Sequence, residues 1–404
     1  MLLRRSDLVV IAAPFAVAAA LGLARRPRGL PEVHIDAPAR ALLEGERLDV
    51  VVTVTAADRV DVASVLLLVP PWLVPDGAPV SRAVAVAAGE QVDVGFPLRS
   101  QRWGRRRLGP AVLHATGANG LLRCGPFASR AGLVTTWPLR EEFVATDAVP
   151  RAGSLVGLHR SRWLGEGTDV AGVRPFVPGD RLHRVNWRVT QRTGRLHVTS
   201  TYSDRDTEVL LVLDSRQDLG RPPDSCLDTG LRAAAAIAEH YLREGDRVGL
   251  LDLGQHLRRV RAGNGRAHMV RILDVLLDVR PLNQYDQAAA TQLPMVSLPA
   301  TVPAGGLVVV LGPLAGEAAF RLLAGLARAG HAVVAVDTLP PQARPEPYTF
   351  WTDLAFRLWR MERQGDIVAL ADLGVPVVPW LGTGSLDQVL RDVSRAARAP
   401  RLRR

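Results

Sequence analysis

The chain contains no lysine among its 404 residues, so arginine alone carries its net charge of +10. Replacement of lysine by arginine codons in a GC-rich genome accounts for this composition. A basic protein can bind nucleic acid or anionic lipid. However, aromatic residues make up only 5% of the chain, and no zinc-finger or RNA-recognition signature is present. The composition therefore does not favour a nucleic-acid-binding protein.

Cysteine is also scarce, because only Cys124 and Cys226 occur and neither has a metal-ligand partner at short spacing. We expect both to be small buried side chains. No glycine-rich dinucleotide fingerprint or phosphate-binding P-loop follows a predicted strand, which excludes those two classes of nucleotide site. Hydrophobic residues form 48% of the chain and charged residues 22%, as in a globular protein. A length of 404 residues predicts two or three domains.

The first long apolar run is Leu8–Ala24, which carries no charge. Two arginines precede it and three follow it closely. A cleaved signal peptide fits the length, but its small residues are followed by more apolar ones. A buried core helix fits poorly because no polar face is visible. We therefore predict a membrane anchor over residues 1–30 and a single-pass protein of the plasma membrane. The heavier arginine cluster after the run predicts a cytoplasmic body.

In the predicted domain 31–140, the stretch from Glu46 to Trp137 follows a period of two, with short apolar runs about ten residues apart and glycine, proline or aspartate between them. The runs are LDVVVTVTA, VDVASVLLLV, AVAVAA, QVDVGFPL and RRLGPAVLHATG. Such spacing without helical segments predicts an immunoglobulin-like antiparallel β-sandwich.

From residue 206 to residue 404, apolar runs alternate with helical segments. The predicted strands are EVLLVLD, VGLLDL, LVVVLG, AVVAVD and PVVPW, and the predicted helices are Leu231–Arg243, His268–Val279, Glu317–Arg328, Trp351–Gln364 and Leu386–Ala397. Strand and crossover repeat with short loops, which predicts a parallel, doubly wound α/β sheet covered on both faces.

Between these two domains lies a charged connector, residues 141–205. It places an acid before an arginine, an aromatic residue and a Pro-Gly-Asp turn, and then continues through arginine and tryptophan to the strand that ends in Asp214. These positions are Asp169, Arg174, Phe176, Gly179, Asp180, Arg184, Asn186, Trp187, Arg192 and Asp214. The order resembles the bacterial Domain of Unknown Function 58 family. The resemblance implies one or two N-terminal hydrophobic helices, a von Willebrand factor A-like domain and a partnership with a MoxR-type AAA+ ATPase.

A metal-binding domain of the von Willebrand type ends its first strand with Asp-x-Ser-x-Ser, and oxygen ligands of this kind suit Mg²⁺. Here Arg216 and Asp218 occupy the two serine positions, and Gly312 stands where a later aspartate is expected. A degenerate site of Asp214, Asp218 and Thr229 is one interpretation. In the other, Asp214 caps a helix or pairs with Arg216, and the sheet edge binds a protein without an ion. We prefer this second interpretation.

The connector allows three interpretations. Its arginines can pair with Asp169 and Asp180 and so clamp the two domains together. Alternatively, Trp187 can present a docking surface. A third possibility is an acid–base pair of Asp180 and His183. We favour the clamp.

The sequence thus predicts a non-catalytic, membrane-anchored adaptor or assembly protein with no cofactor, whose partner is a protein and not nucleic acid. One alternative is a magnesium-dependent, adhesion-type ligand-binding module. The other alternative is a hydrolase.

Overall fold

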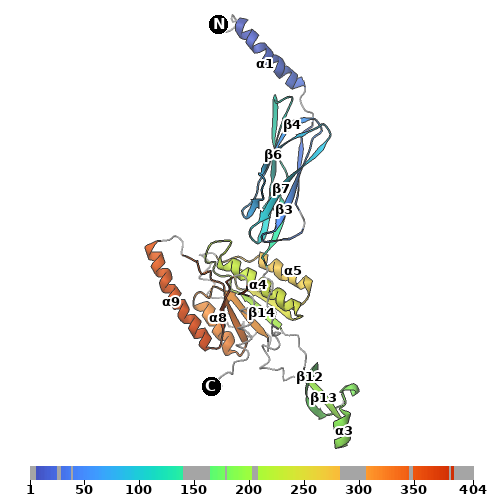
Figure 1. Cartoon of the computed structure of the whole chain (residues 1–404), viewed down its shortest axis with the longest axis vertical. Coiled ribbons are helices and arrows are strands. Elements are labelled where there is room, and N and C mark those ends of the chain that lie inside the picture. The colour runs from blue at the N-terminus through green and yellow to red at the C-terminus, as the bar shows by residue number, and fades with distance from the viewer. Residues whose placement is uncertain are drawn as a thin grey trace. The chain divides into compact units, whose positions relative to one another are not determined.

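The computed structural model describes residues 6–24, 29–37, 40–139, 164–177, 180–202, 208–282, 306–344, 349–381 and 384–385. The chain divides into two compact units, Met1–Leu139 and Arg140–Arg404. Figure 1 shows the helices and strands of each.

The N-terminal apolar run forms helix α1, Ser6–Ala24, of 19 residues. At 1.5 Å per residue the helix is about 28 Å long, close to the hydrocarbon thickness of a bilayer. Its window Asp7–Ala24 has a mean hydropathy of 2.1 and almost no buried surface. Within the described residues it is the one helix long and apolar enough to cross a membrane, a property that signal sequences share.

The rest of the first unit consists of strands, as the period of two predicts. One sheet has the order β1-β3-β7-β5, a second β10-β9-β4-β6 and a third β2-β11-β8. Their bounds are β1 Glu32–Asp36, β2 Leu42–Leu43, β3 Arg47–Thr55, β4 Val60–Leu67, β5 Leu73–Pro75, β6 Ser81–Val86, β7 Gln91–Ser100, β8 Gly104–Leu108, β9 Ala111–Gly117, β10 Leu122–Ala128 and β11 Gly132–Trp137.

The core of this unit lies between the two four-stranded sheets. Val50 and Val52 of β3 are buried, and they belong to one apolar cluster with Val65 of β4 and Leu113 of β9. Full burial of each such side chain stabilises the fold by about 1.5–3 kcal/mol. The alternation of apolar and polar residues therefore directs one face of each sheet inward.

One predicted run was wrong in its extent. RRLGPAVLHATG is two strands, β8 and β9, and they belong to different sheets. The break falls at Gly109 and Pro110. Gly109 has a φ of +92°, which residues with a side chain rarely adopt, and proline has no N–H for a sheet ladder.

The second unit contains a six-stranded sheet with the order β16-β15-β14-β17-β18-β19. All neighbours are parallel except β16, which pairs antiparallel with β15. The strands are β14 Glu208–Leu213, β15 Arg247–Asp252, β16 Arg258–Gly263, β17 Leu307–Gly312, β18 Ala332–Asp337 and β19 Val377–Pro379. The helices of this region are α4 Cys226–Arg243, α5 Arg266–Leu277, α8 Glu317–Arg328 and α9 Phe350–Asp372.

Helices cover both faces of this sheet (Figure 1). Val212 points toward the apolar cluster that includes Leu322 of α8 and Leu370 of α9. Its neighbour Leu213 points the other way, because a Cβ added to Gly230 of α4 would lie 3.2 Å from Leu213 Cδ1. The prediction of a sheet covered on both faces is therefore confirmed.

Several predicted bounds in this sheet were wrong. The antiparallel strand β16 was missed, so the sheet is mixed and not wholly parallel. Helix α4 begins five residues before Leu231, because Ser225 and Asp228 form a capping box there. Helix α5 spans Arg266–Leu277 and not His268–Val279, and α9 continues past Gln364 to Asp372. The predicted helix Leu386–Ala397 lies outside the described residues.

Candidate functional site

The carboxyl ends of the strands gather acidic side chains at one edge of the α/β sheet. Asp214 follows β14, Asp252 ends β15 and Asp337 ends β18. The sheet order reverses between β14 and β17, since the chain builds outward to β16 before it crosses to the other side of β14. Open α/β sheets bind their ligands outside the carboxyl ends of the strands at such a switch point. A ligand or partner site is therefore expected at this edge of the sheet.

At the switch point, Asp214 is buried and forms a bidentate ion pair with Arg216. The guanidinium Nε lies 2.7 Å from Oδ1 and Nη2 lies 2.7 Å from Oδ2. Both side chains are almost fully buried. Burial alone lowers the pKa of Arg216, but the hydrogen bonds and charge of Asp214 outweigh it and raise that pKa. The carboxylate that a metal site would use is thus neutralised by the chain's own arginine.

Gly312, at the end of β17, passes directly beside this pair. A Cβ added at Gly312 would lie 2.8 Å from Asp214 Cβ, which is closer than real Cβ atoms approach. The aspartate that a von Willebrand-type metal site would need at this position therefore has no room in this arrangement.

The other two residues of the predicted metal site have partners within the protein. Asp218 Oδ1 accepts a hydrogen bond from the Leu227 amide at 3.1 Å, at the N-terminus of α4. The Thr229 hydroxyl donates to the Ser225 carbonyl at 2.9 Å. Among the described residues, no group of three or more His, Cys, Asp and Glu side chains is arranged to hold a metal ion. Metal binding by Asp214, Asp218 and Thr229 stays a prediction, and Arg216 is the residue that opposes it.

Asp252 is a functional candidate that the sequence analysis missed. It is only 2% exposed, accepts a very short hydrogen bond from the Ser215 hydroxyl, and accepts another from the Gly254 amide at 3.0 Å. Burial raises its pKa, Asp214 adds to the rise, and the two hydrogen bonds and Arg258 oppose it. The signal was present, because Asp252 ends a predicted parallel strand and so had to share an edge with Asp214.

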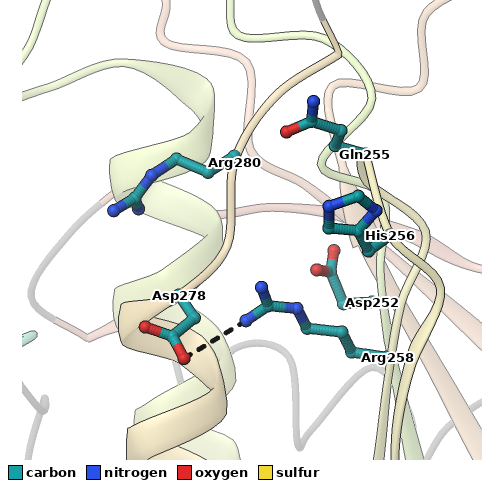
Figure 2. A pocket seen from close by; sticks show the side chains of 6 residues that line it. All are labelled: Asp252, Gln255, His256, Arg258, Asp278 and Arg280. Atoms are coloured by element: carbon teal, nitrogen blue, oxygen red, sulfur yellow. Dashed lines mark ion pairs between the residues drawn. The ribbon is translucent and has the colours of Figure 1, made fainter.

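A pocket opens beside Asp252. Its volume is about 340 Å³, and it is lined by Asp252, Gln255, His256, Arg258, Asp278 and Arg280. Figure 2 shows the His256 ring next to the Asp252 carboxylate, with the Arg258–Asp278 ion pair below them. That pair is 3.3 Å long. Arg280 Nη1 donates to the Val279 carbonyl at 2.8 Å. The lining offers charges of both signs and hydrogen-bonding groups, as a surface that recognises a polar partner would.

A second buried ion pair lies at the end of β18. Arg363 of α9 forms a short ion pair with Asp337, and its Nε donates to the Pro313 carbonyl at 2.8 Å. Both Arg216 and Arg363 therefore place guanidinium groups against acids at strand ends. The charges of Asp214 and Asp337 at this edge are therefore balanced by arginines of the chain itself.

The connector forms a small module of its own. Strand β12, Leu164–Pro175, pairs antiparallel with β13, His197–Tyr202, and between them lie a short helical turn η3, Leu182–Arg184, and helix α3, Trp187–Thr193. Asn186 caps α3, because its side-chain oxygen accepts from the Val189 amide at 3.2 Å.

Asp180, at the end of the predicted Pro-Gly-Asp turn, forms a bidentate ion pair with Arg174. Arg174 Nη1 and Nη2 lie 2.7 Å and 2.6 Å from the two Asp180 carboxylate oxygens. Asp180 also accepts from the Val177 amide at 2.9 Å. The hydrogen bonds from Arg174, followed by the bond from Val177, lower the pKa of Asp180. Because both partners belong to the connector, this pair fixes the local turn.

The remaining predicted connector residues differ in their exposure. Trp187 is 64% exposed and Arg192 is exposed, while Phe176 and Arg184 are half-buried. Gly179 and the side chains of Asp169 and His183 lie outside what the structure describes. Trp187 does not pack inward, and its role as a docking surface stays a prediction. The inter-domain clamp and the Asp180–His183 acid–base pair stay predictions.

Comparisons with known proteins find one matching family model and several similar proteins. Residues 172–348 match the family described as "Protein of unknown function DUF58". Uncharacterized proteins of Mycobacterium bovis and Mycobacterium tuberculosis are 31% identical over 200 residues, which is 47% of this chain. The chain spans 61% of the length of these relatives. The family match covers the second half of the connector and the first five strands of the α/β sheet, β14 to β18.

Solved structures give weaker similarities. A CARDB domain from Pyrococcus furiosus, solved in complex with di-metal ions, is 14% identical, covers 26% of this chain and 87% of its own, and has a TM-score of 0.21. Native alpha-2-macroglobulin from Escherichia coli is 12% identical, covers 92% of this chain and 55% of its own, and has a TM-score of 0.22. Scores this low carry no argument about fold or function.

Proposed function

We propose that this protein is a non-catalytic, membrane-anchored adaptor that binds a protein partner at the carboxyl edge of its α/β sheet without a metal ion. The observation that carries the proposal is the buried Asp214–Arg216 ion pair. In this pair the Arg216 guanidinium neutralises the carboxylate that a magnesium ion would otherwise bind. The pocket beside it offers a polar surface for a partner.

The strand order supports a von Willebrand A-like interpretation of this domain. Three strands lie on one side of the switch point and three on the other, and the edge strand β16 runs antiparallel. Domains of that type bind protein ligands at this edge of the sheet. The partnership with a MoxR-type AAA+ ATPase and the cytoplasmic side of the membrane rest on the family resemblance and on the arginines around α1.

The partner experiment uses the full chain, crosslinked in its native membrane and then extracted in detergent. We expect a specific protein, an AAA+ ATPase under this proposal, to be enriched with the parent chain. A variant with Gln255→Ala and His256→Ala should lose it, because these exposed residues line the pocket. The matched control changes Arg243 and Glu244 to alanine, two exposed residues at the C-terminal end of α4, which leads into the start of β15 at the opposite edge of the sheet. Equal recovery of the partner by all three chains would refute the sheet edge as the binding surface.

The magnesium-dependent alternative is tested separately by thermal unfolding of the purified full chain. A ligand that binds the native state raises stability, so a site for the ion would raise the unfolding midpoint in millimolar magnesium. We expect no rise. A rise that disappears in Asp214→Ala would overturn the metal-free proposal and establish the alternative.

A further inference from the structure

Helix α9 packs against the sheet with only one of its faces. Arg363 and Leu370 are its buried side chains, and Ile367 adds to the apolar cluster beneath them. The opposite face is apolar and exposed. It carries Trp351, Leu354, Leu358, Met361 and Val368, whose exposures lie between 42% and 75%. We call these five residues the α9 seam. Isolated exposed apolar side chains are ordinary, but a continuous row along one helix marks an interaction surface.

The spacing within the α9 seam is that of a coiled coil. Successive members are three, four and three residues apart, and Val368 follows Met361 by one heptad. In heptad notation, Trp351 and Leu358 occupy a positions, together with Gly365, while Leu354, Met361 and Val368 occupy d positions. Phe356, Arg363 and Leu370 then fall on f, the position farthest from the seam. Two of these three, Arg363 and Leu370, are the buried residues of α9, so the side of the helix that packs on the sheet lies opposite the seam.

The flanks of the seam are complementary to a second copy of the same helix. Arg357 occupies a g position and Glu362 the following e position, five residues later. In a parallel pair of helices, the g position of one chain faces this e position of the other. Each Arg357 would therefore face the Glu362 of the other copy, which gives two such contacts in the pair. Arg357 is 73% exposed, and among the described residues its ion-pair partner is Asp353 of the same helix, at 2.6 Å. Its guanidinium can therefore reach a partner helix.

We propose that two copies of this chain associate through the α9 seam as a parallel, two-stranded helix pair. The charge of α9 favours this occupant over a lipid surface. Its four acids are Asp353, Glu362, Asp366 and Asp372, against three arginines, and a net negative helix is not attracted to anionic lipid. The proposal does not rest on the proposed function, because the seam and the pocket beside Asp252 are formed by different elements.

Disulfide crosslinking of the full chain in membranes tests the contact. Cys124 is first changed to serine, and Cys226 is kept, because its burial raises its thiol pKa to about 12 and leaves it unreactive. Leu354→Cys or Leu358→Cys on the seam should then form an intermolecular disulfide on mild oxidation. Arg360→Cys, exposed on the flank of the same helix, is the matched control and should crosslink far less. Equal crosslinking at all three positions, or none at the two seam positions, would overturn the proposal.

Charge reversal tests the parallel orientation. Arg357→Glu or Glu362→Arg alone places like charges across both symmetry-related contacts, and should weaken the association about three- to thirtyfold. The double reversal restores opposite charges and should restore the crosslinked fraction at Leu358→Cys. Failure of the double variant to recover while each single variant is impaired would exclude the parallel register.

A spin label at Leu358→Cys, in the full chain reconstituted into bilayers, distinguishes a second copy from a membrane or water as the surroundings of the seam. Spin–spin broadening from a second label supports the α9 seam as an interface between copies. Relaxation by oxygen dissolved in lipid, without broadening, would show that a membrane covers the seam. Relaxation by a water-soluble nickel chelate, without broadening, would show that nothing covers it. Either of the last two results refutes the proposal.

Discussion

Arg216 closes a bidentate ion pair on Asp214, two residues before it in the chain, with both oxygen–nitrogen distances at 2.7 Å. The pair is buried at the switch point of the sheet. Its energetics follow from burial, because the loss of one partner leaves a charge in a medium that solvates it poorly.

The first prediction concerns that pair. Asp214→Asn or Arg216→Met alone should lower the free energy of unfolding by about 3–5 kcal/mol, because each leaves the other charge unpaired. The double variant should be less destabilised than the sum of the two. Denaturant unfolding of the four chains gives the coupling energy as a double-mutant cycle. Additive effects would contradict a direct interaction.

Asp252 gives a prediction on pH. Its folded pKa is raised, so between the unfolded value, about 3.9, and the folded value the native state binds more protons. The free energy of unfolding therefore falls as the pH rises through that window. Asp252→Asn can still accept the hydrogen bonds of Ser215 and Gly254 but does not titrate. We expect a flatter pH dependence and equal or greater stability at pH 7.

Gly312 allows a steric test of the metal-site interpretation. Gly312→Asp restores the acid of a von Willebrand-type site, but its Cβ collides with Asp214. We expect a loss of about 1–3 kcal/mol, as for overpacked interiors. Gly325→Ala on α8 is the control, since its Cβ meets nothing within 4 Å and alanine favours the helix. A Gly312→Asp chain as stable as the parent, and further stabilised by magnesium, would show that the edge accommodates an ion.

The connector pair predicts a local effect. Arg174 and Asp180 retain substantial exposure, so Asp180→Ala should leave the thermal midpoint of the full chain unchanged. The Val177 amide loses its acceptor, and its hydrogen exchange should become faster. Because the pairing lowers the pKa of Asp180, acid should produce the same effect only as the pH falls through that lowered value. A large drop in the midpoint, with faster proteolysis between the domains, would favour the clamp.

Helix α1 predicts retention in the membrane. N-terminal sequencing of the mature protein should find Leu8–Ala24 still attached, because arginines flank the run on both sides. A mature N-terminus near residue 25 would identify a signal peptide instead.

Local patterns predicted much of the fold. Glu317–Arg328 and Ala332–Asp337 were predicted to the residue, because apolar periodicity and burial coincide there. Strand β16 was missed because only Val260 among its residues is buried, so its sequence has no apolar run. The start of α4 was missed because a polar capping box sets it, and not a hydrophobic residue.

Fewer features of the candidate site than of the fold could be predicted from the sequence. Pairing of Asp214 with Arg216 could be considered because the two residues are neighbours. The contacts of Asp252 with Ser215 and of Arg363 with Pro313 join residues 37 and 50 positions apart. Such contacts depend on the strand order, which periodicity does not specify. The sequence also could not predict whether Trp187 is buried or exposed, since a tryptophan beside arginines occurs both in cores and on surfaces.

The composition of β16 has a consequence for self-association. Among the described strands β16 is the outer strand at one edge of the sheet, and exposed edge strands can template another strand and promote aggregation. Arg259 and Arg261 are exposed along it, and their charge discourages such pairing. At the opposite edge, β19 is only three residues long and ends in Pro379. Both edges of the sheet thus disfavour edge-to-edge pairing between copies of this chain, so an association of copies would have to use another surface, such as a helix.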